Sequence, residues 1–342
     1  MLIEHPVLVT GAAGFIGFYV ARRLAGQGRP VVGVDNLNSY YDPTLKQARL
    51  DRLASDASFR FYKLDLADRV GTARLFATHR FPVVVHLAAQ AGVRYSLNDP
   101  HAYLDANLTG FLNVLEGCRQ NDCQHLLYAS SSSIYGANTR LPFSTSDSAD
   151  HPLSLYGATK KANELMAHSY AHLFGLPATG LRFFTVYGPW GRPDMAMWLF
   201  AAAITAGNPI RLFNHGRMRR DFTYVDDAVE SVVRLVDKPP KPDPMWSGDA
   251  PNAATSAAPW RVYNIGNSRP VEVTEVVRLI ERAIGKPASY EMLPMQSGDV
   301  PETRADISEL VAAIGFVPKT SIQEGVDRFI AWYQEYREGK LA

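Results

Sequence analysis

The sequence predicts an α/β protein with a doubly wound parallel sheet and a smaller α/β domain in its C-terminal part. Three observations indicate this fold class. Short apolar runs alternate with amphipathic helical stretches through the first half of the chain, the first run leads directly into a glycine-rich turn, and the simple alternation ends after Phe184. Alternating strands and helices favour a parallel sheet with helices on both faces. At 342 residues the chain is long enough for a large core, expected in two closely joined domains.

The first strand–helix–strand unit carries a nucleotide-binding pattern. A buried strand is expected at 7–10, a helix ends near Gly26, and a second strand at 31–34 leads into Asp35. Residues 11–17, GAAGFIG, join the first strand to the helix with the spacing G-x-x-G-x-x-G. Small residues let the backbone approach a pyrophosphate, and the helix N-terminus supplies N–H donors to it. Asp35, about 20 residues further on, can accept hydrogen bonds from ribose hydroxyls.

These features predict a Rossmann domain that binds a dinucleotide. Asp35 is followed by Asn36, and no arginine stands directly after it. Because a carboxylate at this position would repel a 2′-phosphate, NAD is favoured over NADP.

The alternation then continues through four more units. Strands are expected at 59–64, 82–88, 125–130 and 178–183, and helices at 42–54, 69–78, 105–118 and 155–173. Ligands bind at the carboxyl ends of parallel strands, where Asp65, Ala88, Ser131 and Thr185 fall. Asp65 suits an adenine contact and a helix N-cap equally well. His86, inside an apolar strand, is expected to be a satisfied core histidine.

The second half of the chain is less regular. Helices are expected at 197–206, 227–236, 274–284 (with Thr274 as N-cap) and 322–336, a strand at 262–265, and a long surface loop at 237–259. Arg217, Arg219 and Arg220 cluster beside a predicted domain junction, where they suit a diphosphate better than solvent. We expect residues 1–185 to form the NAD-binding domain, with 222–238 and 261–266 returning to it, and 186–221 with 267–342 to form the second domain.

Composition argues against several other classes of protein. Lysine and arginine number 35 and aspartate and glutamate 34, so there is no overall attraction to nucleic acid or an anionic membrane. Cys118 and Cys123 fit neither a disulfide framework nor a metal motif, so we expect thiols in a reducing compartment and no metal. Residues 1–5 lack the features of a signal peptide, and no apolar run approaches the length of a membrane span, so a cytoplasmic location is expected.

A run of serines and a tyrosine–lysine pair follow the strand at 125–130. Tyr156 and Lys160 are four residues apart at the start of a predicted helix, so they share one face. An ammonium beside a phenol favours the phenolate and can lower the phenol's pKa from its usual value of about 10. Tyr156 is therefore a candidate general acid/base, with a hydroxyl from Ser130 to Ser133 as a second proton-handling group.

With Gly11, Gly14, Gly17, Asp35, Asn107 and Tyr156-x-x-x-Lys160 in this order, the whole chain resembles the extended short-chain dehydrogenase/reductase family. Three segments resemble nucleotide-sugar epimerases, and specifically UDP-glucuronate 4-epimerases. These are DNLNSYYD at 35–42, HLAAQAGVR at 86–94 and RFFTVYGPWGRPDM at 182–195.

The resemblance implies site residues. Tyr156 acts as the base, Lys160 binds the nicotinamide ribose, and Ser131 is the partner hydroxyl, with Ser132 and Ser133 as alternatives. Tightly bound NAD+ is expected at Gly11, Gly14, Phe15, Ile16, Gly17, Asp35, Asn36, Asn38, Asp65, Leu66, Ala88, Ala89, Gln90, Asn107, Tyr156 and Lys160. The UDP-sugar substrate is expected at Arg94, Ser131, Ser132, Ser133, Tyr156, Thr185, Arg192, Arg220 and Asp299. A homodimer is expected through the helices near 107–118 and 155–173.

The serine run separates the subfamilies. Related dehydratases carry an Asp-Glu pair where this chain has Ser132 and Ser133, related decarboxylases carry glutamate at the place of Ser133, and UDP-galactose epimerases carry asparagine at the place of Thr185. The resemblance thus implies reversible oxidation at C4 of UDP-glucuronate to give UDP-galacturonate, with short hydroxyl side chains available to hold the C5 carboxylate. The alternatives are a UDP-glucose or UDP-N-acetylhexosamine 4-epimerase, a UDP-glucuronate decarboxylase, and a non-enzymatic NAD-binding regulatory module.

Overall fold

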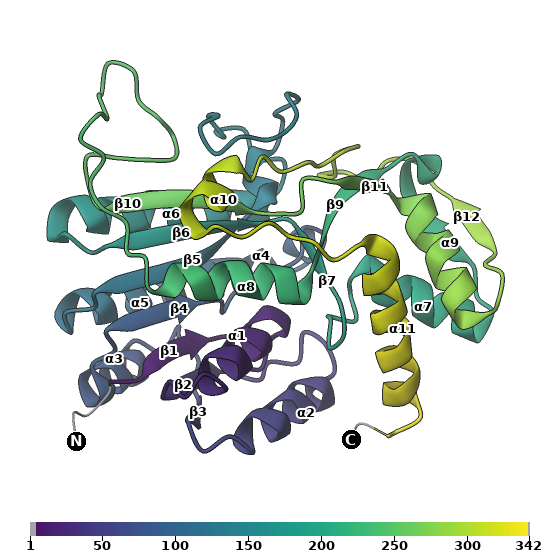
Figure 1. Cartoon of the computed structure of the whole chain (residues 1–342), viewed down its shortest axis with the longest axis horizontal. Helices are drawn as coiled ribbons and strands as arrows, with labels where there is room; N and C mark the ends of the chain where they lie inside the picture. Colours follow the sequence, from purple (N-terminus) through teal and green to yellow (C-terminus); the bar gives the residue numbers. More distant parts are fainter. Residues whose placement is uncertain (1–4, 341–342) are drawn as a thin grey trace.

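A seven-stranded sheet runs through the centre of the molecule in the computed structural model, which describes residues 5–340 (Figure 1). Every neighbouring pair of strands is parallel. The order across the sheet is β10 (Trp260–Ile265), β6 (Ala178–Phe183), β5 (His125–Ser131), β4 (Val83–His86), β1 (Val7–Thr10), β2 (Val31–Asp35) and β3 (Phe59–Lys63). The predicted doubly wound parallel sheet is confirmed. Residues 1–4, on which most of the signal-peptide expectation depends, lie outside the described part.

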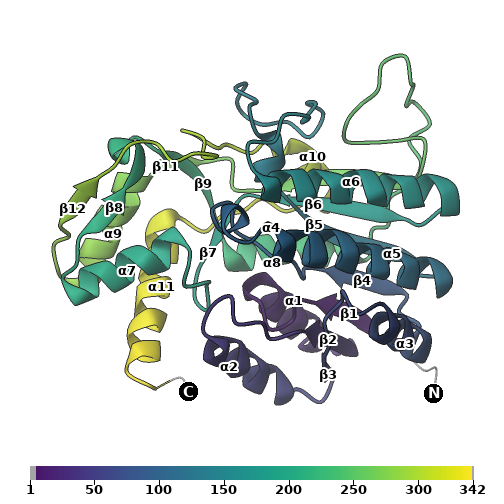
Figure 2. The ribbon, with the colours of Figure 1, turned by 180° about the vertical axis from the view of Figure 1, so that it is seen from behind.

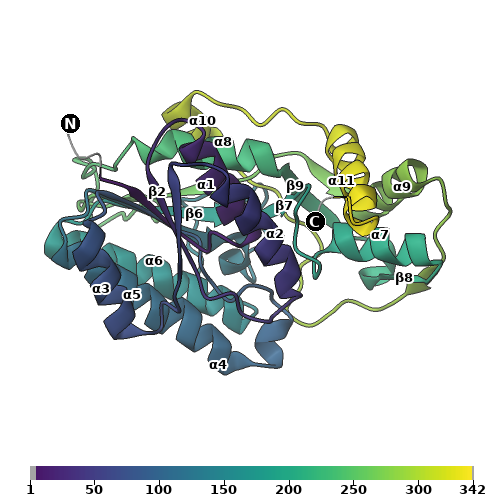
Figure 3. The same cartoon turned by 90° about the horizontal axis from the view of Figure 1, so that it is seen from below.

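Helices cover both faces of this sheet, as Figures 2 and 3 show from behind and from below. One face carries α1 (Phe15–Ala25) and α8 (Val225–Val236), which pack together, and the other carries α3 (Arg69–His79), α5 (Gly110–Gln120) and α6 (Leu155–Phe174). The strands are buried on both faces, which explains why β1 and β2 are apolar almost throughout.

The strand order reverses between β1 and β4, the two neighbours in the middle of the sheet. Successive strands run outward from β1 to β3 on one side, and from β4 through β5 and β6 to β10 on the other. In open α/β sheets a crevice forms at such a reversal, outside the carboxyl ends of the strands. The fold therefore places the main ligand site there.

A second region lies beside those carboxyl ends (Figure 1). It contains a three-stranded sheet in the order β11-β9-β7 and a two-stranded sheet of β12 and β8. Its helices α7, α9 and α11 pack together. The bounds are β7 (Thr185–Tyr187), α7 (Ala196–Ala206), β8 (Ile210–Leu212), β9 (Arg219–Tyr224), β11 (Pro270–Glu272), α9 (Val273–Ile284), β12 (Tyr290–Met292) and α11 (Ile322–Arg337). Helix α10 (Ser308–Ile314) instead contacts β10 and α8 of the central region.

Several expected elements differ in detail from the observed ones. The helix expected at 105–118 is preceded by α4 (Pro100–Tyr103) and divided into a π-helical segment, Leu104–Thr109, and α5. The prediction that Thr274 caps a helix is wrong, because α9 begins one residue earlier and the N-cap position is Glu272. Residues 237–259, all described, form neither helix nor strand and project as the long loop before β10 in Figure 1, as predicted.

The remaining elements connect the main ones. They are α2 (Pro43–Ala54), capped by Asp42, and the 3-10 turns at Tyr95–Leu97, Ser132–Tyr135 and Phe213–Gly216. Within residues 5–340, no helix has both the length and the apolar character that crossing a membrane requires.

Candidate active site

A cavity of about 1090 Å³ lies between the carboxyl ends of the central strands and the second region. Nearly all of the predicted site residues line it, although they come from distant parts of the chain. From the cofactor set these are Gly11, Gly14, Phe15, Ile16, Gly17, Asp35, Asn36, Asn38, Asp65, Leu66, Ala88, Ala89, Gln90, Tyr156 and Lys160. From the substrate set they are Arg94, Ser131, Ser132, Ser133, Thr185, Arg192 and Asp299.

The glycine turn forms one end of this cavity. Gly11 has a φ of +69°, and a Cβ there would lie 2.8 Å from the backbone nitrogen of Ala88. A Cβ on Gly17 would lie 2.0 Å from the carbonyl oxygen of Gly11. No side chain among the described residues caps α1, whose N-cap position is Gly14, so its first N–H groups remain available for a ligand. The turn thus offers a close backbone surface with free donors, which suits a pyrophosphate.

Two carboxylates lie next to the glycine turn on the same wall. Asp35 accepts hydrogen bonds from the backbone nitrogens of Ala13 (3.2 Å) and Leu37 (2.9 Å), which fix its position at the end of β2. Asp65 accepts a hydrogen bond from Asn36 Nδ2 at 2.9 Å. The N-cap of α3 is Asp68, so Asp65 does not cap that helix. Each carboxylate retains lone pairs that can accept from hydroxyl or amine groups of a ligand.

The middle of the wall is shaped by a buried hydrogen-bond network. Thr10 Oγ1 accepts from the backbone nitrogens of Leu87 and Ala88, each at 3.1 Å, and lies 2.9 Å from His86 Nδ1. His86 is buried and stacks on Phe111, and burial lowers its pKa to about 3, so it is neutral. The prediction of a satisfied core histidine is confirmed.

Tyr156, Lys160 and Ser131 all line the cavity, and Tyr156 is hydrogen-bonded to Ser131. Tyr156 lies in the first turn of α6, which begins at Leu155 with Ser154 as its cap, and Ser131 is the last residue of β5. The Lys160 ammonium donates to the carbonyl oxygen of Ala129 at 2.8 Å. The lysine is almost completely buried, and this burial lowers its pKa to about 7.

The prediction that Lys160 lowers the phenol's pKa is wrong in this structure. Burial raises the pKa of Tyr156 above its usual value, while a hydrogen bond with Ser131 and the positive charge of Arg192 act in the opposite direction. Lys160 is not among these groups because its ammonium is directed to the main chain of β5. The pKa of Tyr156 is therefore raised mainly by burial, and Ser131 and Arg192 only partly offset this effect.

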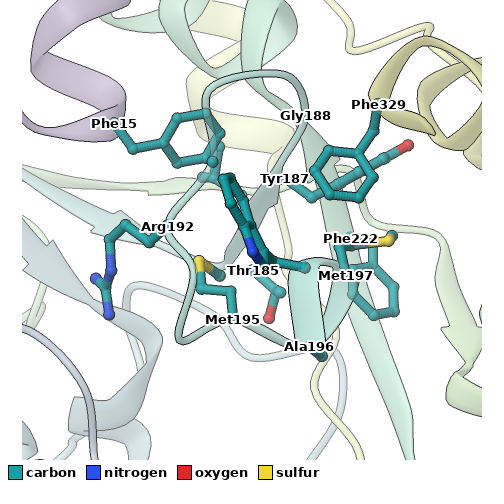
Figure 4. A pocket seen from close by; sticks show the side chains of 13 residues that line it. Phe15, Thr185, Tyr187, Gly188, Arg192, Met195, Ala196, Met197, Phe222 and Phe329 are labelled. Carbon is teal, nitrogen blue, oxygen red and sulfur yellow. The ribbon is translucent and has the colours of Figure 1, made fainter. Parts of the chain in front are cut away.

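The serine run turns sharply at the end of β5. Ser131 Oγ accepts a hydrogen bond from the backbone nitrogen of Ser133 at 3.2 Å and so caps the 3-10 turn Ser132–Tyr135. This turn presents Ser132 and Ser133 to the cavity, which Thr185 at the start of β7 also lines. Figure 4 shows Thr185 on β7 and Arg192 on the chain between β7 and α7, with the Arg192 guanidinium directed away from Phe222 and Phe329. A small apolar cavity of about 20 Å³ lies among these residues.

Two arginines of the predicted substrate set, Arg192 and Arg220, are paired with carboxylates. Arg192 donates to both oxygens of Asp194, from Nε at 3.0 Å and Nη2 at 2.5 Å, and Tyr40 donates to the same carboxylate at 3.0 Å. Arg220 Nη2 donates to Asp299 at 2.7 Å. Both guanidinium groups are thus held in fixed directions and partly neutralised.

Two predicted site residues stand behind the cavity wall. Asn107 is buried and forms hydrogen bonds with both backbone groups of Gln90 and with Thr159 Oγ1, so it holds the loop after β4. Arg220 contacts Asp299 and the carbonyl oxygen of Pro301. Neither side chain lines the cavity, whereas Gln90 and Asp299, to which they are hydrogen-bonded, do, and a direct contact of Asn107 or Arg220 with a ligand stays a prediction.

The structure adds lining residues that the sequence did not single out. Tyr40 and Lys46 come from the segment after β2, and Phe213 and Gln296 come from the second region. Gln296 Oε1 is buried and accepts no hydrogen bond from residues 5–340, so it can accept one from a ligand. Tyr40 lies within a segment that carried the family resemblance, whereas Phe213 and Gln296 follow no periodic or motif signal.

Fold and site together define a class of protein. A parallel sheet with its strand order reversed at a glycine turn, a carboxylate at the end of β2, and a Tyr-x-x-x-Lys pair beside a serine describe an α/β enzyme that uses a bound dinucleotide. The turn fits such a cofactor on its own geometry, since side chains at Gly11 or Gly17 would meet backbone atoms at 2.8 Å or less. Within the described chain, no group of three or more His, Cys, Asp or Glu side chains could hold a metal ion.

Comparison with known proteins agrees with this class. Residues 7–254 match the NAD dependent epimerase/dehydratase family, and the chain belongs to it, as the sequence motifs predicted. "Protein CapI" of Staphylococcus aureus is 54% identical over 330 residues, 96% of this chain and 98% of that protein. A "Probable UDP-glucuronate 4-epimerase" of Rhizobium meliloti is 52% identical over 335 residues, 96% of this chain and 97% of its own.

A solved structure shares the whole fold. The UDP-glucuronic acid 4-epimerase of Bacillus cereus, crystallised with UDP-glucuronic acid and NAD, superimposes with a TM-score of 0.86 at 30% sequence identity. The match covers 97% of this chain and 99% of that one. The doubly wound fold and the second region therefore recur together in that enzyme.

Proposed function

We propose that this protein is a UDP-glucuronate 4-epimerase that uses bound NAD to interconvert UDP-glucuronate and UDP-galacturonate. The observation that carries the proposal is the set of residues that line the cavity. Tyr156, Lys160 and Ser131 line it together, and so do the hydroxyl-bearing residues Ser132, Ser133 and Thr185. The first three residues can move a proton at C4 of a sugar. None of Ser132, Ser133 and Thr185 is a carboxylate that could promote elimination.

The cofactor would be held along the first wall of the cavity. The free N–H groups at the start of α1 suit its pyrophosphate, Asp35 suits the adenosine ribose, and Lys160 suits the nicotinamide ribose. Bound NAD+ supplies a hydride acceptor that takes a hydride from the sugar and later returns it, with no net change in oxidation state.

Tyr156 handles the proton that accompanies this exchange. As the phenolate it removes the proton from the C4 hydroxyl of the sugar, and as the phenol it returns that proton to the C4 oxygen after the 4-keto sugar has turned and taken the hydride back on the other face of C4. Ser131 donates a hydrogen bond that stabilises the phenolate, and the charge of Arg192 acts in the same direction. These two groups lower the cost of forming a phenolate in a buried site.

The remaining polar groups suit an acidic sugar. Ser132, Ser133 and Thr185 can donate hydrogen bonds to a C5 carboxylate, which keeps it solvated and prevents loss of carbon dioxide from the 4-keto acid. Arg94, Arg192 and Asp299 line the outer part of the cavity, where a diphosphate can be held while the sugar turns. Arg220 supports this end through its contact with Asp299.

The same reasoning assigns a task to each part of the chain. We propose that residues 1–185, joined by 222–238 and 261–266, bind NAD, and that 186–221 and 267–342 bind the UDP-sugar. The contacts of α8 with α1, and of β10 with β6, support the return of the two later segments to the first domain.

We also propose that two copies associate through α5 and α6. These neighbouring helices expose apolar side chains to solvent: Leu112 is 42% exposed, Leu165 61%, Leu173 65% and Phe174 49%. A second copy packed on this surface would bury them in a four-helix contact. Replacing Leu165 with glutamate should convert a dimer into a monomer on size-exclusion chromatography with light scattering. A cytoplasmic location is supported by the free thiols of Cys118 and Cys123, which fit a reducing compartment.

The function is tested by incubating the purified protein with UDP-glucuronate and separating the products. UDP-galacturonate should accumulate until the two sugars reach equilibrium, without added reductant. UDP-xylose or a 4-keto pentose as the main product would indicate a decarboxylase, and faster turnover of UDP-glucose or UDP-N-acetylglucosamine would indicate an epimerase of neutral sugars. Tight NAD binding without any turnover would support a regulatory module.

A further inference from the structure

A buried ion pair lies directly behind the serine run and has no part in the reaction described above. Arg182 on β6 donates from Nε and Nη2 to the two carboxylate oxygens of Glu164 on α6, at 2.9 and 3.0 Å. The two side chains are 0% and 2% exposed. A buried pair of this kind stabilises a fold little compared with apolar residues of similar size, because both charges lose their hydration. Apolar residues could not replace the directional hydrogen bonds that the ion pair forms.

Those hydrogen bonds reach the segments that carry the proposed catalytic residues. Ser130 Oγ donates to Glu164 Oε1 at 2.7 Å, which ties the end of β5 to α6. Glu164 lies one turn after Lys160 on the same face of that helix. Arg182 lies on β6, three residues before Thr185. The pair therefore links the strand of Ser131, the helix of Tyr156 and Lys160, and the strand that leads to Thr185.

The network also holds the 3-10 turn that presents Ser132 and Ser133. Arg182 Nη1 donates to the Tyr135 hydroxyl at 3.0 Å, and Tyr135 donates to Asn264 Oδ1 on β10 at 2.7 Å. Tyr135 is the last residue of that turn. The serine run is thus anchored to one buried pair at both of its ends, through Ser130 and through Tyr135.

We propose that Ser130, Glu164 and Arg182 are positioning residues. They hold Ser132 and Ser133 at the distance from Tyr156 at which these serines bind the carboxylate of the sugar, so that the carboxylate is retained. The proposal rests on the proposed function, and it concerns the outcome of turnover rather than the proton transfer itself. If the run shifts, Ser132 and Ser133 no longer hold the carboxylate of the 4-keto acid. Decarboxylation then breaks the C5–C6 bond, releases carbon dioxide, and leaves the electron pair in an enolate that is protonated at C5.

The test uses Ser130→Ala, which removes one anchor and leaves the ion pair intact. Ser130→Thr keeps the hydroxyl and serves as the rescue. Tyr128→Phe is the matched control, because it removes another buried hydroxyl from β5, one that accepts from Trp260 Nε1 at 3.0 Å and does not contact the serine run. The full-length proteins are loaded with NAD+ and incubated with UDP-glucuronate. The measurements are the decarboxylated share of the products, the KM and the Tm.

Ser130→Ala should raise the decarboxylated share about tenfold or more, the effect of losing one hydrogen bond to a charged group, with little change in KM. Ser130→Thr should restore the wild-type share of decarboxylated product. Tyr128→Phe should leave this share unchanged, even if its Tm falls as far as the Tm of Ser130→Ala. An unchanged share in Ser130→Ala, or an equal rise in Tyr128→Phe, would overturn the positioning role while leaving the epimerase assignment intact. A wild-type protein that does not epimerise UDP-glucuronate would overturn both.

Discussion

The two walls of the cavity are built in different ways. The cofactor wall, formed by the turn at 11–17, the ends of β2, β4 and β5 and the start of α6, offers mainly backbone groups and a few small or acidic side chains. The sugar wall, formed by 183–213 and 296–299, offers arginines and aromatic rings. On the cofactor wall Asp35 is fixed by neighbouring backbone N–H groups, whereas Arg192 on the sugar wall is already paired with Asp194.

This difference indicates how each wall works. A surface of fixed backbone groups is preorganised for one ligand, and any side chain added there obstructs it. A surface of paired charges binds an anion only by sharing or exchanging partners, so it discriminates among ligands by affinity. We therefore expect changes on the cofactor wall to abolish turnover of every substrate, and changes on the sugar wall to alter KM.

Tyr156→Phe should have the largest effect. Removing a general acid/base should lower kcat by about 10²–10⁴-fold for acidic and neutral UDP-sugars alike, with little change in KM. Tyr103→Phe is the control, since this phenol lies next to Tyr156, with ring centroids 6.1 Å apart, and donates only to backbone carbonyls of Ala91 and Gly92. Steady-state kinetics of both variants measures the difference. Comparable losses in the two would contradict the role of Tyr156.

Gly11→Ala should be next in size, because it tests the close backbone approach. Gly175→Ala is a matched control: the φ angles are +69° and +66°, but for Gly175 no atom of the described chain lies within 4 Å of the added Cβ. The left-handed conformation should cost each variant about 1–2 kcal/mol. Gly11→Ala should lose about 1–3 kcal/mol more through overpacking, together with its bound NAD. Urea unfolding and the NAD content of the purified proteins measure both effects, and equal stabilities with full NAD content would refute the preorganised turn.

The pH dependence of stability tests the buried ammonium of the cofactor wall. Burial lowers the pKa of Lys160 from 10.5 to about 7, so between these values the unfolded chain binds more protons at this site than the folded one. The cost of burying Lys160 is therefore full below pH 7 and falls as pH rises, by up to about 1.4 kcal/mol per pH unit. Lys160→Met should remove this dependence. The free energy of unfolding of wild type relative to Lys160→Met, measured from pH 6 to 9, should rise with pH, and a flat difference would contradict the shift.

Arg192→Lys should have the smallest effect. It tests whether the sugar wall, unlike the cofactor wall, acts through substrate affinity. Lysine keeps the charge but cannot form the two parallel hydrogen bonds to Asp194. KM for UDP-glucuronate should rise about tenfold, which corresponds to about 1.4 kcal/mol, while kcat changes less. Initial rates over a range of substrate concentrations separate the two parameters. A loss confined to kcat would place Arg192 with the catalytic groups instead.

The sequence by itself determined the sheet and its cofactor, and it predicted Tyr156, Lys160 and Ser131, which line the cavity. These depend on local patterns: the glycine turn, the acid that ends the next strand, and Tyr156 one helical turn from Lys160. It also placed the serine run correctly at a strand end. Each of these features joins residues close together in the chain, or residues at strand ends that a parallel sheet must bring to one edge.

Only the tertiary structure determined the features that depend on contacts between residues far apart in the chain. It assigned Asn107 to the loop after β4, paired Arg220 with Asp299, and brought Phe213 and Gln296 to the cavity from segments without a motif. It also reversed the expectation for the Tyr156 pKa, because burial and the direction of the Lys160 ammonium depend on how α6 packs against β5. A sequence shows which charged groups are near in the chain, but the solvation and partner of a buried charge are properties of the packed molecule.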